Sequence, residues 1–136
     1  MSKLIDQLKV HEGFRSKPYK CTADKLTIGY GLNLDAGIDG ELAEMILNYQ
    51  VQKVKSSLDK FPWYASIDSE ARKDAIVNMA FNLGVAGVCK FMKMINAISL
   101  RDYHQAAAEM LDSKWAKQVG TRAVELAEQM RSGQYR

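Results

Sequence analysis

Apolar residues recur every three or four positions through most of the chain, which is the spacing that buries one face of an α-helix. The first stretch of this kind follows Ser2, a residue type that caps helices, and aligns Leu4, Ile5 and Leu8 on one side. A second and longer stretch covers residues 40–61. The pattern therefore predicts a short N-terminal helix and a long amphipathic helix.

The most apolar stretch lies in the middle of the chain. It starts after Asp68 or Ser69, which are both helix-capping residue types, and stops at Gly84, where glycine commonly ends a helix. Pro62 separates it from the preceding helix, because proline cannot continue a helix that is already formed. Three shorter helices are predicted after it, over residues 90–98, 101–112 and 121–131.

The helical spacing is lost over residues 14–35, where turn residues and glycines interrupt the chain. Thr27 and Ile28 are β-branched residues that favour strands, and Gly29 and Gly31 are typical of tight turns or close backbone approach. We expect a small antiparallel sheet of two or three strands here. The predicted fold class is therefore α+β, a mostly helical body with a small sheet near its N-terminal end.

Composition narrows the class of protein. The chain has 136 residues, of which 47% are hydrophobic, and this suits a single domain with a real core. Its formal net charge of +3 is too small to indicate nucleic-acid binding. No stretch is apolar and long enough for a signal segment or a membrane span, so we expect synthesis in the cytosol. Cys21 and Cys89 are expected to be free thiols, and no residue spacing suggests a metal or a cofactor.

One carboxylate has a setting that suits acid catalysis. Glu12 ends the first predicted helix and is followed by Gly13. The negative end of the helix dipole disfavours an ionised carboxylate there, and partial burial would act in the same direction. Taken alone this is weak evidence, because most glutamates lie on the surface and have no catalytic role.

The residues around Glu12 carry a family resemblance. Glu12, eight residues, Cys21, five residues and Thr27, followed by "IGYG", resembles the Glu–Asp/Cys–Thr signature of the phage-type lysozymes, glycoside hydrolase family 24. The segment "AIVNMAFNLGVAGVCKF" resembles that family's central helix, and residues 106–135 resemble its C-terminal region. The segment "GLNLD" is similar to a branch of short phage endolysins. Together these blocks cover nearly the whole chain.

The resemblance implies a fold and an activity. The fold is one lysozyme domain over residues 1–136, with a cleft between a sheet-containing lobe of about 13–60 and a helical lobe of 61–136 that includes the N-terminal helix. The activity is hydrolysis of the β-1,4 bond between N-acetylmuramic acid and N-acetylglucosamine in peptidoglycan. A monomeric endolysin of this kind would wait in the host cytoplasm until a membrane-permeabilising holin releases it to the wall.

The resemblance also implies roles for particular residues. Glu12 would protonate the leaving oxygen, and Thr27 would position the attacking water. Arg122 would pair with Glu12. Three further residues, Phe81, Asn82 and Asn33, would bind the substrate.

Cys21 stands where many family members have a second acidic residue. A thiol with a pKa of about 8.5 is mostly neutral at pH 7, unlike a carboxylate. Either Lys20, Lys25 or Arg122 favours its thiolate, or the thiol acts through polarity and shape. Asp24 is the alternative second carboxylate. The family's usual histidine after the second glycine is absent, because residue 32 is a leucine.

Other activities remain open on the residues alone. A Cys-dependent amidase would use Cys21 as nucleophile with His11 or His104 as base. A lytic transglycosylase would need only Glu12 and would release 1,6-anhydro ends. A non-catalytic wall-binding module would have kept the fold without the chemistry, although the presence of Glu12 argues against it.

Overall fold

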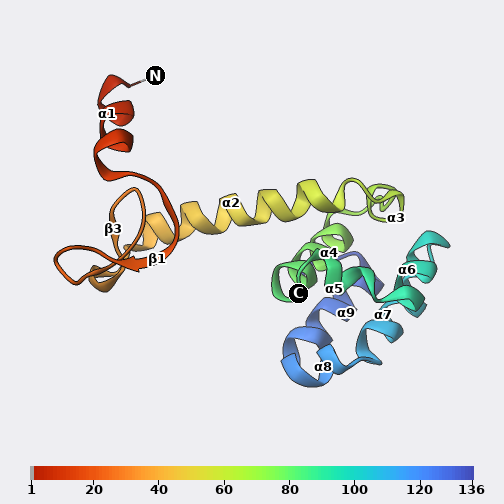
Figure 1. The fold of residues 1–136 in the computed structure, drawn as a ribbon. Coiled ribbons are helices and arrows are strands. Elements are labelled where there is room, and N and C mark those ends of the chain that lie inside the picture. Colours follow the sequence, from red (N-terminus) through yellow and green to blue (C-terminus); the bar gives the residue numbers. More distant parts are fainter. Residues whose placement is uncertain (1) are drawn as a thin grey trace. The chain divides into compact units, whose positions relative to one another are not determined.

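The computed structural model describes residues 2–136, and these residues form two compact units, 2–46 and 47–136. Each unit is considered by itself, and the lobe boundaries and the cleft expected from the sequence stay predictions. Every helix within residues 2–136 is too short or too polar to cross a membrane. Figure 1 labels most of the helices and strands that are named below.

The first unit begins with helix α1 (Lys3–Glu12). Ser2 caps this helix as expected, because its Oγ accepts a hydrogen bond from the backbone N–H of Ile5 at 3.3 Å. The helix ends at Gly13, which has a positive φ of 69° and donates its N–H to the carbonyl of Lys9. Glu12 is therefore the last residue of α1, as the sequence predicts.

The sheet expected within residues 14–35 is present and has three short antiparallel strands, in the order β1-β2-β3. They are β1 (Arg15–Lys20), β2 (Leu26–Gly29) and β3 (Leu32–Asn33). Thr27 lies in the central strand, opposite Tyr19 on one side and Asn33 on the other. A 3₁₀ turn, η1 (Leu34–Ala36), follows the sheet and leads to helix α2 (Gly40–Leu58). The α+β fold class is confirmed.

The second unit contains residues 47–58 of α2 and a further set of helices, packed around one apolar core. They are α3 (Pro62–Ala65), α4 (Glu70–Leu83), α5 (Val85–Cys89), α6 (Met92–Ser99), α7 (Tyr103–Leu111), α8 (Lys114–Val119) and α9 (Thr121–Ser132). Helix α4 lies at the centre, with six buried side chains, and packs against α5 and α9. The largest fully buried side chains include Ile76, Met79, Met94, Met110 and Met130.

Capping decides where the central helix starts and stops. Ser69 rather than Asp68 is the cap of α4, because the Ser69 Oγ accepts a hydrogen bond from Arg72 N at 3.3 Å. Gly84 ends the helix with a positive φ of 82°. The long helix before it, α2, stops at Leu58, three residues earlier than its apolar pattern indicates.

Three short helices were not expected. Helix α3 forms where the sequence indicates only a break, because Pro62 is unable to continue a helix but is well suited to the first turn of a new one. Helices α5 and α8 have five and six residues, which is too short to show a helical repeat of apolar positions.

Candidate functional site

Glu12 lies against the turn that joins β2 and β3. A Cβ atom placed on Gly31 would lie 2.6 Å from Oε2 of Glu12 and 3.1 Å from its Cδ. The end of α1 and this turn are therefore in direct contact within the first unit. The Glu12 side chain is exposed rather than partly buried. The helix terminus and the glycine turn thus position this carboxylate together.

Thr27 is the buried polar residue of the sheet, with 4% of its surface exposed. Its Oγ1 donates a hydrogen bond to the carbonyl of Lys25 at 2.8 Å. Its neighbour across the sheet is Asn33, whose Oδ1 accepts a hydrogen bond from Asp35 N at 3.0 Å. Asp35 in turn accepts one from Leu26 N at 2.9 Å. These bonds hold Thr27 and Asn33 in fixed orientations on adjacent strands.

Cys21 lies just after β1 in the connection to β2 and is half-buried. Hydrogen bonding to the backbone of Lys25 lowers the pKa of its thiol, and a smaller contribution comes from the backbone of Ala23. The lowered pKa favours the thiolate, but lysine charge is not its source. Lys20 instead pairs with Asp24 at 3.7 Å on an exposed turn. The Cys21 N–H donates at 3.0 Å to the same Lys25 carbonyl as the Thr27 hydroxyl, so the structure brings Cys21 and Thr27 together.

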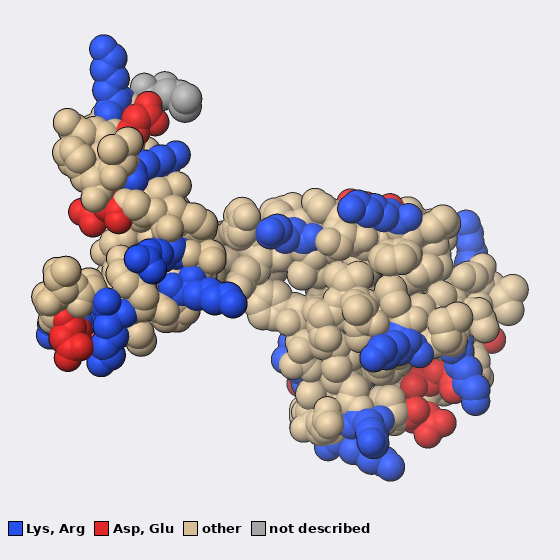
Figure 2. Space-filling model, viewed as in Figure 1, with Lys and Arg blue, Asp and Glu red and all other residues tan. Residues whose placement is uncertain are grey.

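Basic side chains gather over this sheet (Figure 2). Residues 13–34 contain four basic residues, Arg15, Lys17, Lys20 and Lys25, and one acidic residue, Asp24, a net charge of +3. This equals the formal net charge of the whole chain, so the other residues hold equal numbers of basic and acidic side chains. The excess is confined to the strands and their turns, because the flanking residues Glu12 and Asp35 are acidic and residues 2–46 as a whole contain six basic and seven acidic side chains.

Phe81 and Arg122 share a pocket of about 280 Å³ in the second unit. Phe81 is exposed there, with 42% of its surface accessible. Arg122 donates from Nε and Nη2 to Oδ1 of Asn78, at 3.0 and 2.7 Å. The expected ion pair of Arg122 with Glu12 would join residues of different units, and it stays a prediction.

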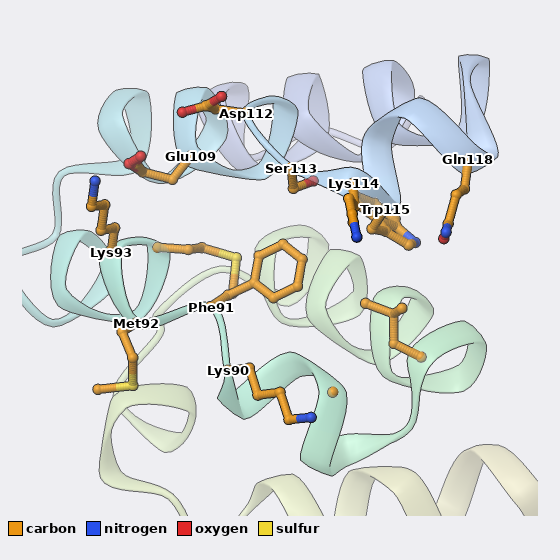
Figure 3. Close-up of a pocket in the computed structure, with 13 residues that line it drawn as sticks. Lys90, Phe91, Met92, Lys93, Glu109, Asp112, Ser113, Lys114, Trp115 and Gln118 are labelled. Carbon is orange, nitrogen blue, oxygen red and sulfur yellow. The ribbon is translucent and has the colours of Figure 1, made fainter.

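Asn82 has a partner on another helix. Its Oδ1 accepts a hydrogen bond at 2.8 Å from Nε1 of Trp115, which is only 3% exposed. Trp115 lines a larger pocket of about 720 Å³ between α5, α6, α7 and α8 (Figure 3). Phe91 and Trp115 meet edge to face in its wall, with ring centroids 6.4 Å apart. The charged side chains of the lining are Lys90, Lys93, Glu109, Asp112 and Lys114.

Sequence reasoning missed two supporting residues. Asn78 positions the Arg122 guanidinium, and its signal was a polar residue inside the most apolar helix, one turn before Asn82. Asp35 ties η1 to β2, and carboxylates in such turns commonly bind backbone N–H groups. Among residues 2–136, no group of three or more His, Cys, Asp and Glu side chains has an arrangement that could hold a metal ion.

Comparison with known proteins decides the family. Residues 9–132 match the phage lysozyme family, which is nearly the whole chain. The chain belongs to the phage lysozyme family. It is therefore a glycoside hydrolase of the lysozyme class, an endolysin with muramidase-type lytic activity on peptidoglycan. The family resemblance noted in the sequence is confirmed.

Individual relatives agree with this placement. The chain is 32% identical to the protein named "Endolysin" of Acyrthosiphon pisum secondary endosymbiont phage 1, over 81% of this chain and 75% of that one. It is 29% identical to "Probable T4-type lysozyme 2" of Dictyostelium discoideum, over 90% of both chains. A shorter match covers 70 residues and is 36% identical to the "Pre-baseplate central spike protein Gp5" of Enterobacteria phage T4. It spans 52% of this chain and 12% of that protein.

Proposed function

We propose that Glu12, Cys21 and Thr27 are the catalytic residues of this muramidase. The observation that carries the proposal is a shared hydrogen-bond acceptor: the Cys21 N–H at 3.0 Å and the Thr27 hydroxyl at 2.8 Å both donate to the carbonyl of Lys25. The turn after the Thr27 strand also contacts the Glu12 carboxylate. Glu12 as the acid, and Cys21 and Thr27 as hydrogen-bond acceptors, are thereby held in the same unit, residues 2–46.

Glu12 acts as the general acid. Its carboxyl proton moves to the glycosidic oxygen as the bond from that oxygen to the anomeric carbon breaks. The ring then develops positive charge, as in other glycosidase transition states. A thiolate at Cys21 supplies the negative charge that the second carboxylate provides in relatives with aspartate at this position.

Thr27 orients the attacking water. Its hydroxyl proton is already donated to the Lys25 carbonyl, so its free lone pair accepts a hydrogen bond from water. The water oxygen bonds to the anomeric carbon, and its released proton passes to the sulfur of Cys21. Proton exchange with solvent then restores the carboxyl of Glu12 and the thiolate of Cys21.

Two asparagines bind sugar through their amide nitrogens. The Oδ1 atoms of Asn33 and Asn82 are both occupied, by Asp35 N and by the Trp115 indole. Each residue therefore offers its NH₂ group to sugar hydroxyls or N-acetyl carbonyls. Phe81 provides an exposed ring for the apolar face of a sugar. Arg122 is held by Asn78 and is the residue that the family resemblance assigns as the partner of Glu12.

The larger pocket suits the peptide part of the same substrate. Its aromatic wall can receive short apolar side chains. Lys90, Lys93 and Lys114 can pair with carboxylates, and Glu109 and Asp112 can pair with amino groups. Peptidoglycan stems carry groups of both signs, so this pocket supports peptidoglycan over an unsubstituted glycan.

Similarity to a phage protein named "Endolysin" supports a role in release of phage from its host. In that role the monomeric enzyme stays in the host cytoplasm until a holin opens the membrane. Expression of the protein alone should leave cells intact, and permeabilising the membrane should then lyse them. Lysis without permeabilisation, or a dimer in gel filtration, would contradict this part of the proposal.

Glu12→Gln is the decisive variant, because the amide keeps the shape but has no acidic proton. We expect wall-clearing activity to fall at least about 100-fold, the usual range for loss of a general acid. Glu125→Gln, on the exposed surface of α9, is the matched control and should keep full activity. Clearing by Glu12→Gln at the wild-type rate would refute the assignment.

Mass spectrometry of the digest identifies the bond that is cut. Hydrolysis gives reducing muramic acid ends, and these should be the main product. Ends of the 1,6-anhydro type would identify a lytic transglycosylase. Free stem peptides would identify an amidase that uses Cys21.

A further inference from the structure

Two glycines of the "IGYG" segment have the same backbone conformation but different surroundings. Gly29 and Gly31 have positive φ values of 68° and 87°, a region in which residues with side chains are strained. A Cβ atom on Gly29 would have no atom within 4 Å. On Gly31 it would lie 2.6, 3.1 and 3.5 Å from Oε2, Cδ and Cγ of Glu12. Backbone conformation alone therefore explains why residue 29 is glycine. At position 31 it is one reason for glycine, and the nearness of Glu12 is a second.

The space left by the missing side chain of Gly31 is occupied by Glu12. Three atoms of the glutamate lie along the backbone of the turn, and 2.6 Å is closer than a Cβ atom approaches other atoms in folded proteins. Glycine is suited to this kind of close approach between backbone and a functional group. The carboxylate is thereby confined on one side by backbone instead of by a flexible side chain.

The turn and α1 are also joined beside this contact. The Lys9 ammonium of α1 lies 5.8 Å from the centre of the Tyr30 ring, next to Gly31. The Tyr30 ring packs at 5.5 Å against Phe14, which follows the end of α1. These contacts oppose movement of the turn away from the helix. A new side chain at 31 is accommodated more readily by rotation of Glu12, whose carboxylate is the mobile end of a long side chain.

We propose that Gly31 is a positioning residue for the general acid, and that its lack of a side chain holds the Glu12 carboxylate in the orientation needed to protonate the substrate. The proposal rests on the function assigned to Glu12 above. It gives the second glycine of the motif a role that Gly29 does not share. A displaced carboxylate costs rate because proton transfer depends on the position of the acid to within about 1 Å.

Gly31→Ala and Gly29→Ala form a matched pair. Both place a methyl group on a residue with positive φ, so both should lower the melting temperature by similar amounts. Only Gly31→Ala adds a clash with Glu12. We expect it to lower kcat by about 10- to 100-fold with KM within about twofold of wild type, whereas Gly29→Ala keeps kcat within about threefold.

A second measurement reports the carboxylate directly, without catalysis. The ¹³C NMR signal of the Glu12 carboxyl carbon should move in Gly31→Ala and stay at its wild-type position in Gly29→Ala. Wild-type kcat in Gly31→Ala would overturn the positioning role. So would an equal loss of kcat in both variants, or an unmoved Glu12 signal in Gly31→Ala.

Glu12→Gln separates failure of this inference from failure of the proposed function. If Glu12→Gln is inactive while Gly31→Ala has wild-type kcat, the catalytic assignment stands and the role of Gly31 is wrong. If Glu12→Gln is fully active, Glu12 is not the acid and both proposals fail.

Discussion

Arg122 donates two hydrogen bonds to a single oxygen of Asn78. Nε and Nη2 lie 3.0 and 2.7 Å from Oδ1, and Nη2 lies 3.3 Å from the Asn78 carbonyl. The pair joins the first turn of α9 to the middle of α4 and sets the plane of the guanidinium. An arginine held in this way is oriented before substrate arrives.

Removing the amide of Asn78 should loosen Arg122. We expect Asn78→Ala to lower the free energy of unfolding by about 1 kcal/mol, because the bonds are charge-assisted but exposed. Activity should fall through a lower kcat, as Arg122 loses its orientation. Urea unfolding and wall-clearing assays measure the two effects. Asn96→Ala, at an exposed position on α6, is the control, and an equal loss there would show that Asn78 has no special part.

Cys21 should tolerate aspartate better than alanine. Aspartate is ionised at pH 7 and can replace the thiolate, whereas a methyl group neither carries charge nor accepts a proton. We expect Cys21→Asp to keep most activity and Cys21→Ala to lose a large part of it. Alkylation should inhibit the enzyme, and a Cys89→Ala background makes Cys21 the target. Full activity of Cys21→Ala would show that the thiol is a spectator.

The dependence of activity on pH should follow the ionisation of the same Cys21 sulfur. Hydrogen bonds lower its pKa, so the thiolate forms at a lower pH than that of an ordinary cysteine. Activity should therefore rise with pH below the usual thiol range. In Cys21→Asp this rise should move to more acidic pH, because the reference pKa of aspartate is about 3.9. An identical profile for both enzymes would contradict a role for the charge at position 21.

The contribution of Thr27 to kcat should depend on its hydroxyl oxygen and not on the shape of its side chain. Thr27→Ser keeps the hydroxyl and should retain most of the kcat. Thr27→Val keeps the shape, loses the bond to the Lys25 carbonyl, and should lower kcat by about 10-fold or more. Thr22→Val, at an exposed position, controls for loss of a hydroxyl near the sheet. Equal kcat values for the serine and valine variants would exclude a water-positioning role.

Tyr64 should make the helical unit sensitive to alkali. Burial, with smaller effects of Asp59 and Asp74, raises the pKa of this phenol to about 12. The pKa of a tyrosine in the unfolded chain is about 10, so the folded state holds the phenol proton more tightly. Stability from this difference is complete below pH 10 and is lost as the pH rises toward 12. Thermal unfolding across this range should show the loss, and Tyr64→Phe should make it smaller.

The sequence alone was informative wherever neighbours along the chain decide the structure. Ser2 and Ser69 cap their helices and Gly84 ends one, because these effects depend on residues within one turn. The family was also readable, since the spacing from Glu12 to Thr27 survives in the linear order of residues. The short helices α5 and α8 could not be predicted, because they contain too few residues to show the helical period of apolar positions.

The sequence by itself determined the main helices, the small sheet, the family and the identity of the candidate acid. Tertiary structure alone decided which groups contact the candidate site residues and orient them. Asn78 and Arg122 are 44 residues apart, and only packing of α4 against α9 brings them together. Only the contact between α1 and the β2–β3 turn distinguishes Gly31 from Gly29. The thiol of Cys21 likewise owes its lowered pKa to hydrogen bonds across a folded turn, whereas neighbouring lysines in the sequence suggested charge. Periodicity and capping are local, but contacts of this kind exist only once the chain has folded.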